Sequence, residues 1–335
     1  MEFEENGKKL AFYASYGIDY TKGSFTQKSI TDDRVVLKKS LVVEDEVVVD
    51  ITLQEALSNG DGFVDVRSSK AFREVHLKDS TNMTLGHIKT MRCLLPPPGA
   101  KLSLVAGSKR DLELAKTELI SYRYHVIFTA EWSQVIERAE DSLLEYKSSF
   151  SRQLWKPSPL LAISLPKIES RVENHRNLCF LDIGAGAGRD LIFSARRGWT
   201  SIGVDHLASH CDRFHTILSV LNSNGESLDC KYHKIDVIEN PKSLPRADVV
   251  HIGRFLHRPL LLHIRDHVVL PGGYFLMHTF MEGCEKFGSP KKPKFLLKSG
   301  ELASVFGERW TVLMDEVRPI TDGRPLSYFM ASKNK

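Results

Sequence analysis

The chain has 335 residues, a formal net charge of +4 and 42% hydrophobic residues, which is ordinary for a globular protein of two domains, at about 150 residues per domain. Its five cysteines lie far apart without a C-x-x-C pair, which argues against a disulfide framework or a zinc site. No apolar run approaches the ~18 residues of a membrane span. The first residues, MEFEENGKK, contain no hydrophobic signal core, so we expect a cytoplasmic protein without a membrane partner.

Residues 1–45 carry few structural signals and are expected to form an N-terminal arm, either partly ordered or packed on the domain that follows. Residues 46–146 alternate short apolar runs with helical patterns. Thr52 and Glu55 have the spacing of a capping box at the start of a helix. The patterns predict strands at 63–66, 102–106 and 126–128, and helices at 111–120 and 131–146. This alternation is typical of a small α/β domain with a parallel sheet.

Two segments of this domain resemble the rhodanese-like domain: D-V-R-S-x-x-A-F at Asp65–Phe72 and the strand–loop–helix at Leu102–Ile120. In an active rhodanese, a nucleophilic cysteine directly follows the later strand. Here the segment Ala106–Arg110 contains no cysteine, and Cys93 lies before the strand. Because only a thiolate can carry the transferred sulfur, we expect an inactive domain with a docking or structural role.

Residues 147–160, KSSFSRQLWKPSPL, are rich in serine and proline and are expected to link this domain to a second one at residues 161–335. Trp155 stands close to two prolines in a rigid, extended segment. Two interpretations stay open for its side chain, which either lies over a bound cofactor or packs between the domains.

The second domain is organised around residues 179–205, CFLDIGAGAGRDLIFSARRGWTSIGVD. The pattern predicts a buried strand, a glycine turn, a helix at 189–197 and a second strand that ends at Asp205. The turn contains Gly184, Gly186 and Gly188. Glycine permits positive φ and lets a ligand approach the backbone closely. In a doubly wound sheet, the ligand lies where such a turn meets the carboxyl end of its strand.

The spacing of the turn indicates which nucleotide it binds. Arg189 takes the place of the third glycine in the dinucleotide fingerprint G-x-G-x-x-G. Asp182, two positions before the first glycine, suits a ligand end that bears an ammonium group better than one that bears phosphate. The resulting pattern, D-x-G-x-G-x-G, resembles motif I of the class I S-adenosylmethionine (SAM) methyltransferases.

This resemblance implies SAM as the cofactor and a Rossmann-like, seven-stranded sheet that ends in an antiparallel hairpin, here at 309–317 and 326–331. It implies that Asp182 lies near the methionine amino group and that Asp205 holds the ribose hydroxyls. Asp236, which follows a third strand, is implied to contact the adenine amino group. A solvent-facing acid at the strand end is the alternative for Asp236.

A fourth strand at 249–252 is followed by Arg254, His257 and Arg258, where transfer chemistry sits in this fold. The segments R-F-L-H-R-P-L and L-x-P-G-G-Y-x-L resemble methyltransferases related to the tellurite-resistance type. His257 is the candidate proton acceptor, and Arg254 and Arg258 are candidates for holding an anionic substrate. For Arg258, a structural salt bridge is the alternative.

Histidines are frequent in this half, but only His263 and His267 have helical i, i+4 spacing, and no H-E-x-x-H motif is present. We therefore expect no metal. The histidines other than His257, including His251 and His278, are expected to be ordinary helix-surface residues. A lysine-rich loop at 286–298 lacks the interleaved aromatic residues of a nucleic-acid surface.

The sequence thus predicts methyl transfer from SAM to an acceptor that it does not identify, with a small or anionic molecule favoured. The alternatives are a non-catalytic SAM-binding regulatory or scaffold protein, an RNA or protein methyltransferase, and an NAD(P) enzyme. The oligomeric state stays open.

Overall fold

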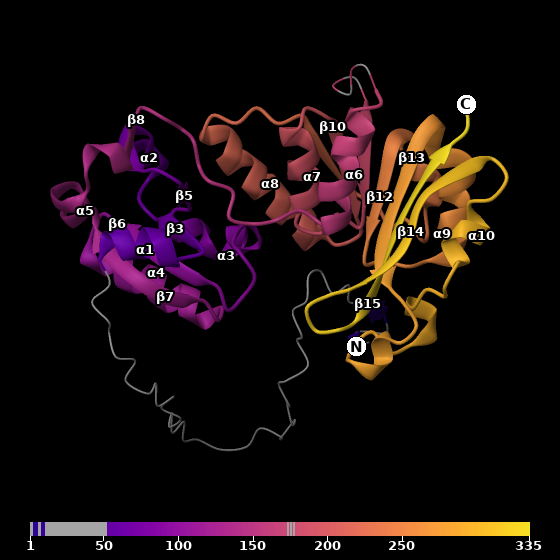
Figure 1. The fold of residues 1–335 in the computed structure, drawn as a ribbon, viewed down its shortest axis with the longest axis horizontal. Coiled ribbons are helices and arrows are strands. Elements are labelled where there is room, and N and C mark those ends of the chain that lie inside the picture. The colour runs from indigo at the N-terminus through magenta and orange to yellow at the C-terminus, as the bar shows by residue number, and fades with distance from the viewer. Residues whose placement is uncertain (1–2, 6–7, 11–51, 173, 175, 177) are drawn as a thin grey trace.

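The structure, a computed structural model, describes residues 3–5, 8–10, 52–172, 174, 176 and 178–335. A short antiparallel hairpin joins β1 (Phe3–Glu5) to β2 (Lys8–Leu10). Most of the arm expected at 1–45, and the start of the domain expected from residue 46, lie outside the described residues. Two larger sheets follow one another along the chain (Figure 1), and we call residues 52–146 the N-terminal unit and residues 158–335 the C-terminal unit.

The N-terminal unit contains a four-stranded, parallel sheet in the order β5-β3-β6-β7. Its central strands are buried, as expected when helices cover both faces of a parallel sheet. The strands are β3 (Gly62–Asp65), β5 (Ser80–Asn82), β6 (Lys101–Ala106) and β7 (His125–Glu131). The helices are α1 (Leu53–Asn59), α2 (Ser69–Glu74), α3 (Ile88–Met91), α4 (Lys109–Ser121) and α5 (Trp132–Arg138).

The predicted capping box is confirmed at the start of α1. The Glu55 N–H donates to Thr52 Oγ1 (3.3 Å), and the Thr52 N–H donates to Glu55 Oε2 (2.8 Å). Two N–H groups that have no partner inside the helix are thereby satisfied.

The predicted helix at 131–146 is wrong in its second half. Helix α5 ends at Arg138, and the chain returns as β8 (Leu144–Tyr146), which pairs antiparallel with β4 (Val75–Leu77). Leu144 packs with Leu77 in a small buried cluster. The helical spacing of apolar residues is real, but pairing with a distant strand overrides local propensity.

The connection between β6 and α4 consists of Gly107 and Ser108 alone. The Ser108 hydroxyl accepts the N–H of Asp111 (3.2 Å) and so serves as the N-cap of α4. The connection is therefore short and takes part in capping the helix.

The C-terminal unit contains a seven-stranded sheet in the order β11-β10-β9-β12-β13-β15-β14, so the expected α/β architecture with a parallel sheet is confirmed. Its last two strands form an antiparallel hairpin. The strands are β9 (Cys179–Ile183), β10 (Thr200–Asp205), β11 (Cys230–Lys234), β12 (Ala247–Gly253), β13 (Val269–Phe280), β14 (Trp310–Pro319) and β15 (Pro325–Lys333).

Helices cover both faces of this sheet (Figure 1). One face packs against α6 (Pro159–Glu169), α7 (Arg189–Arg196) and α8 (Ala208–Ser223). The other packs against α9 (Arg258–His263), the π-helical turn Ile264–Val268 and α10 (Glu301–Val305). In the described part of the chain, no helix combines the length and apolar character needed to cross a bilayer.

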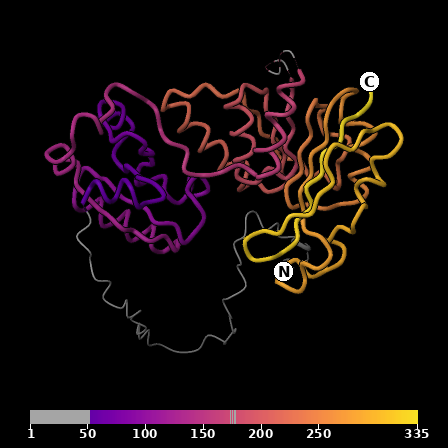
Figure 2. Tube along the Cα trace, viewed as in Figure 1, coloured from indigo at the N-terminus to yellow at the C-terminus, as the bar shows by residue number. Residues whose placement is uncertain are grey.

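The two units lie side by side, and the chain crosses between them through residues 147–157 (Figure 2). Leu154 and Trp155 of this segment are buried in one hydrophobic cluster that contains residues of both units. Trp155 therefore packs between the units, which is the second of its two interpretations. Arg73 of α2 adds a hydrogen bond from Nη1 to the carbonyl of Ser223 at the end of α8 (2.5 Å).

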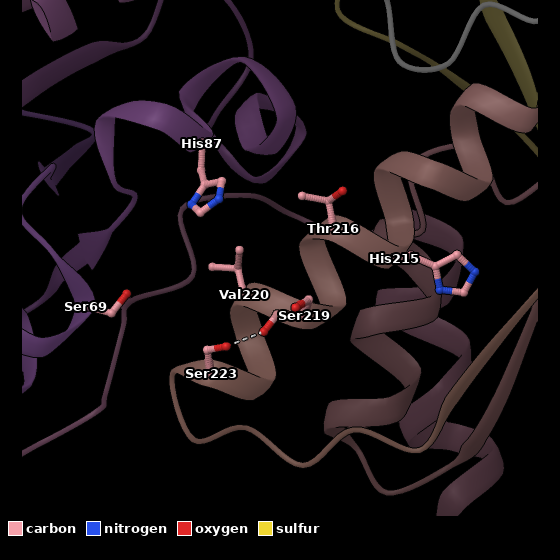
Figure 3. A pocket seen from close by; sticks show the side chains of 7 residues that line it. All are labelled: Ser69, His87, His215, Thr216, Ser219, Val220 and Ser223. Atoms are coloured by element: carbon pink, nitrogen blue, oxygen red, sulfur yellow. Dashed lines mark hydrogen bonds between the residues drawn. The ribbon is translucent and has the colours of Figure 1, made fainter.

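A hollow lies on the same seam, between the N-terminal unit and α8 (Figure 3). Its lining is rich in hydroxyl groups and includes none of the predicted cofactor residues. The lining residues are Ser69, His87, His215, Thr216, Ser219, Val220 and Ser223.

We predict that Gly62→Ala destabilises the protein, because a Cβ at Gly62 would lie 2.4 Å from Cδ2 of Leu154. Such overpacking in a core costs about 1–3 kcal/mol. Urea unfolding measures the loss, with Gly86→Ala as the matched control, since a Cβ at Gly86 meets nothing within 4 Å. Equal stabilities of the two variants would contradict the packing of the crossing segment against β3.

Candidate functional site

The glycine turn follows the carboxyl end of β9. Its three glycines have left-handed backbone conformations, with φ of +74° at Gly184, +57° at Gly186 and +78° at Gly188. These angles explain the choice of glycine at all three positions. A Cβ at Gly186 would meet nothing within 4 Å, so the backbone there is open to a ligand. A Cβ at Gly188 would lie 2.2 Å from Phe214 Cδ2, so this glycine lets α8 pack against the turn.

Asp205 ends β10 beside the turn, as predicted. Its carboxylate accepts the N–H of Gly186 (3.1 Å) and the N–H of Leu207 (2.9 Å), and His210 Nδ1 lies 3.1 Å from Oδ2. Burial raises the pKa of Asp205, but hydrogen bonds from His210, Leu207 and Gly186 outweigh it and hold the pKa below the usual value. The structure thus places an ionised carboxylate against the glycine backbone.

Asp182 lies below the turn and contacts a histidine that the sequence analysis misassigned. His251 of β12 is directly opposite Asp182 in the sheet register, and its Nδ1 lies 2.7 Å from Asp182 Oδ1. His251 Nε2 lies 3.3 Å from Nδ1 of His278 on β13. The expectation of helix-surface histidines is wrong for both, because they lie on strands and their side chains are buried. The signal available was the place of His251 inside the apolar strand predicted at 249–252.

Asp190, in the first turn of α7, completes a buried group with Asp182 and His251, whose potential ligand atoms lie within 4.8 Å of one another. The hydrogen-bond pattern accounts for these groups. Asp182 and His251 satisfy each other, and Asp190 Oδ1 accepts the N–H of Ser158 (2.7 Å), the N-cap of α6. Asp190 therefore ties the crossing segment to the helix that starts at the glycine turn.

Asp236 follows β11 and is exposed. Its Oδ1 accepts the N–H of Ile238 (3.0 Å) and that of Glu239 (3.3 Å), which closes the turn after the strand. The position at the strand end is as predicted, and the side chain has a structural task there.

His257 precedes α9 on the side of the sheet where the strands' carboxyl ends lie. Its ring is partly buried, and Nδ1 has no hydrogen-bond partner among the described residues. Burial lowers the pKa of His257, with Asp236 opposing the shift. The imidazole is therefore neutral at neutral pH and able to accept a proton.

Arg254 and Arg258 differ in their surroundings. Arg254 has φ of +55°, and its guanidinium carbon lies 5.6 Å from the ring centre of Phe280. Arg258 forms an ion pair with Glu301 (Nε–Oε1 2.5 Å) and donates to the carbonyl of Leu296 (2.9 Å). Arg258 thus takes the structural salt bridge that the sequence analysis left open, and it fastens α9 to the segment before α10.

No family model matches the chain. A curated relative, the uncharacterized protein UNK4.09 of Schizosaccharomyces pombe, is 24% identical over 318 residues, which is 81% of this chain and 93% of the relative.

Several solved structures similar to the chain are SAM-dependent methyltransferases. One from Methanosarcina mazei is 16% identical, with a TM-score of 0.42 over 50% of this chain and 97% of that one. Magnesium protoporphyrin IX methyltransferase of Synechocystis, with bound S-adenosylhomocysteine (SAH), is 11% identical, with a TM-score of 0.43 over 52% and 81%. TehB of Haemophilus influenzae is 17% identical, with a TM-score of 0.40 over 51% and 62%.

We predict that Arg258→Met lowers stability by about 1 kcal/mol, because it removes a partly exposed ion pair with Glu301 and the hydrogen bond to the carbonyl of Leu296. Arg309→Met is the matched control, since Arg309 is exposed. Thermal unfolding of both variants measures the difference. An unchanged melting temperature for Arg258→Met would contradict a structural role for this ion pair.

Proposed function

We propose that the C-terminal unit is a SAM-dependent methyltransferase acting on a small, anionic acceptor. The observation that carries the proposal is the open backbone at Gly186, held by the ionised carboxylate at the end of the neighbouring strand. A sulfonium nucleoside suits this arrangement, because glycines admit its body and a strand-end acid accepts its ribose hydroxyls.

The predicted residues take the following roles in this proposal. Asp205 binds the ribose hydroxyls, and Asp182 faces the methionine ammonium across the turn of Gly184, Gly186 and Gly188. Asp236 uses Oδ1 for its own turn, and we assign Oδ2 to the adenine amino group. A buried carboxylate is suited to a cationic ligand end, because an opposite charge close by stabilises its ionised form.

SAM supplies an already activated methyl group, so the protein has to position the acceptor and remove at most one proton. We assign proton acceptance to Nδ1 of His257, which is neutral and without a partner among the described residues. The acceptor's nucleophilic atom would take the methyl group that SAM supplies, leaving SAH, and its proton would pass to His257. We assign no substrate-binding role to Arg258, because its guanidinium forms an ion pair with Glu301.

An anionic acceptor is supported by arginines at the carboxyl edge of the sheet. Arg254 and Arg324 both lie over Phe280, with guanidinium carbons 5.6 and 4.7 Å from the ring centre. Arg318 lies 5.0 Å from the ring centre of Tyr328 on the adjacent strand. Arg318 also forms an ion pair with Glu316 and Arg324 one with Asp322, each at 2.7 Å. Arginines stacked on aromatic rings are weakly hydrated and well suited to a planar carboxylate.

We assign the N-terminal unit a docking or structural role. The observation behind this is the two-residue connection between β6 and α4, in which Ser108 is the cap of the helix. The hydrophobic cluster that contains residues of both units supports a structural role, in which the N-terminal unit stabilises the C-terminal unit by packing against it.

We predict that SAM and SAH stabilise the purified protein against heat, and that Asp205→Ala weakens their binding about 10- to 150-fold, because charge-assisted hydrogen bonds contribute about 1.5–3 kcal/mol. Asp205→Asn keeps the shape and separates lost charge from lost folding. Asp212→Ala, at an exposed position on α8, is the control. Failure of both ligands to stabilise the wild-type protein would remove the proposed function.

We predict that His257→Ala leaves SAH affinity unchanged and slows methyl transfer about 10²- to 10⁴-fold, the usual contribution of a positioned base. Transfer of radiolabelled methyl from SAM into a small-molecule fraction of cell extract provides the assay. Since burial lowers the pKa of His257, the wild-type rate should stay constant as pH falls from neutral and should decline only below the ordinary histidine pKa. Equal rates for wild type and variant would exclude the assigned base. No transfer by the wild type, together with tight SAM binding, would indicate a non-catalytic SAM-binding protein.

A further inference from the structure

Three side chains form a buried polar row across neighbouring strands beneath the glycine turn: Asp182 on β9, His251 on β12 and His278 on β13. We propose that His251 and His278 are positioning residues of the cofactor site, which hold a proton beside Asp182 until a ligand's ammonium group replaces it. This inference rests on the proposed function and adds two residues and a proton exchange to its site.

The sheet register produces the row. Asp182 lies opposite His251, and His251 lies opposite Leu276, two positions before His278. Since side chains of a strand alternate between faces, all three polar groups point to the same face, the one covered by α6 and α7. Phe180, Val249 and Leu276 fill that face towards the amino ends, so the polar row stands at the edge of an apolar stripe.

The row is closed to water and therefore has to be neutralised internally. Asp182, His251 and His278 are 3%, 1% and 3% exposed. An isolated carboxylate in such a place is strongly disfavoured, and a protonated imidazole is the partner at hand. Burial disfavours the imidazolium, but the charge of Asp182 outweighs it and raises the pKa of His251. Burial, followed by the charges of His251 and Arg254, sets the pKa of His278 well below the ordinary value.

These directions assign the protons. With His251 protonated, Nδ1–H donates to Asp182 and Nε2–H donates to Nδ1 of neutral His278. When His251 loses its proton from Nε2, that nitrogen becomes an acceptor, and His278 has to present Nδ1–H. His278 Nδ1 can thus serve as acceptor or as donor towards Nε2 of His251, according to the state of that ring.

Other charged groups near the row are few. Asp190 on α7 and Asp205 on β10 act on Asp182 electrostatically, and Arg254 acts on His278. Tyr232 on β11 faces Asp182 and Asp205, and burial keeps its phenol protonated. The ring of Tyr328 on β15 lies 6.4 Å from that of His278. The two additional carboxylates favour a positive charge in this place, whether it belongs to His251 or to a ligand.

In the proposed function, a ligand ammonium approaches Asp182 over the glycine turn. His251 occupies Oδ1, and a Cβ at Gly184 would have only the Cβ of Phe255 near it, at 3.9 Å. Two positive charges beside one buried carboxylate repel each other, so the arriving ammonium expels the proton of His251 to solvent. Binding of an ammonium-bearing ligand should then become tighter as pH rises, and it should level off above the pKa of His251 in the ligand-free protein.

The test is proton release on binding, measured by titration calorimetry near neutral pH in two buffers of different ionisation enthalpy. SAH carries the ammonium group, and adenosine carries only the nucleoside part. We expect SAH to release up to about one proton more than adenosine does. His251→Asn keeps a nitrogen donor for Asp182 and cannot titrate, so SAH should still bind while the excess release disappears. His263→Asn on α9 is the matched control and should keep the wild-type proton count.

Equal proton release for SAH and adenosine in the wild-type protein, or an undiminished excess in His251→Asn, would overturn the inference while leaving the proposed function intact. Absence of SAH and SAM binding at every pH would instead overturn the proposed function and this inference together. The comparison of the two ligands needs only the wild-type protein, so it decides the matter even where His251→Asn does not fold.

Discussion

The burial of the Asp182 carboxylate is the constraint on which the cofactor end of the molecule depends. Asp182 lies inside a sheet, 3% exposed, where an unpaired charge would cost several kcal/mol. The register of β9 against β12 places His251 opposite it, and one hydrogen bond of 2.7 Å satisfies both. A one-residue shift in the register of β9 against β12 would separate Asp182 from His251. The pair therefore depends on the same register that aligns the ends of these two strands.

The same region joins the two units. Ser158, directly after the crossing segment, donates its N–H to Asp190, the neighbour of the Arg189 that follows the turn. Arg189 reaches the carbonyl of Cys93 in the N-terminal unit at 3.5 Å. Shared apolar packing extends from the first sheet to α6, α7 and α8. The N-terminal unit therefore packs against the helices that flank the glycine turn.

Local signals in the sequence were sufficient for the glycine turn, for Asp205 at its strand end and for the capping box at Thr52, because each is set by residues close together in the chain. The His251 pair was missed, since it depends on register between strands 69 residues apart. Arg258 was ambiguous for the same reason, as Glu301 lies 43 residues further on. The helix predicted through residue 146 failed where β8 pairs with β4. Long-range pairing, absent from local periodicity, accounts for all three cases.

The polar groups of the site divide into two sets with different physical duties. Beneath the turn, the charges are buried and mutually satisfied, so they can discriminate a ligand by its charge and protonation. At the carboxyl edge, the arginines lie over Phe280 and Tyr328, and Arg318 and Arg324 are paired with Glu316 and Asp322. A methyl donor that brings its own activation leaves little chemistry for the protein beyond orientation. Under the proposed function, acceptor choice falls to the shape and charge of this arginine–aromatic edge.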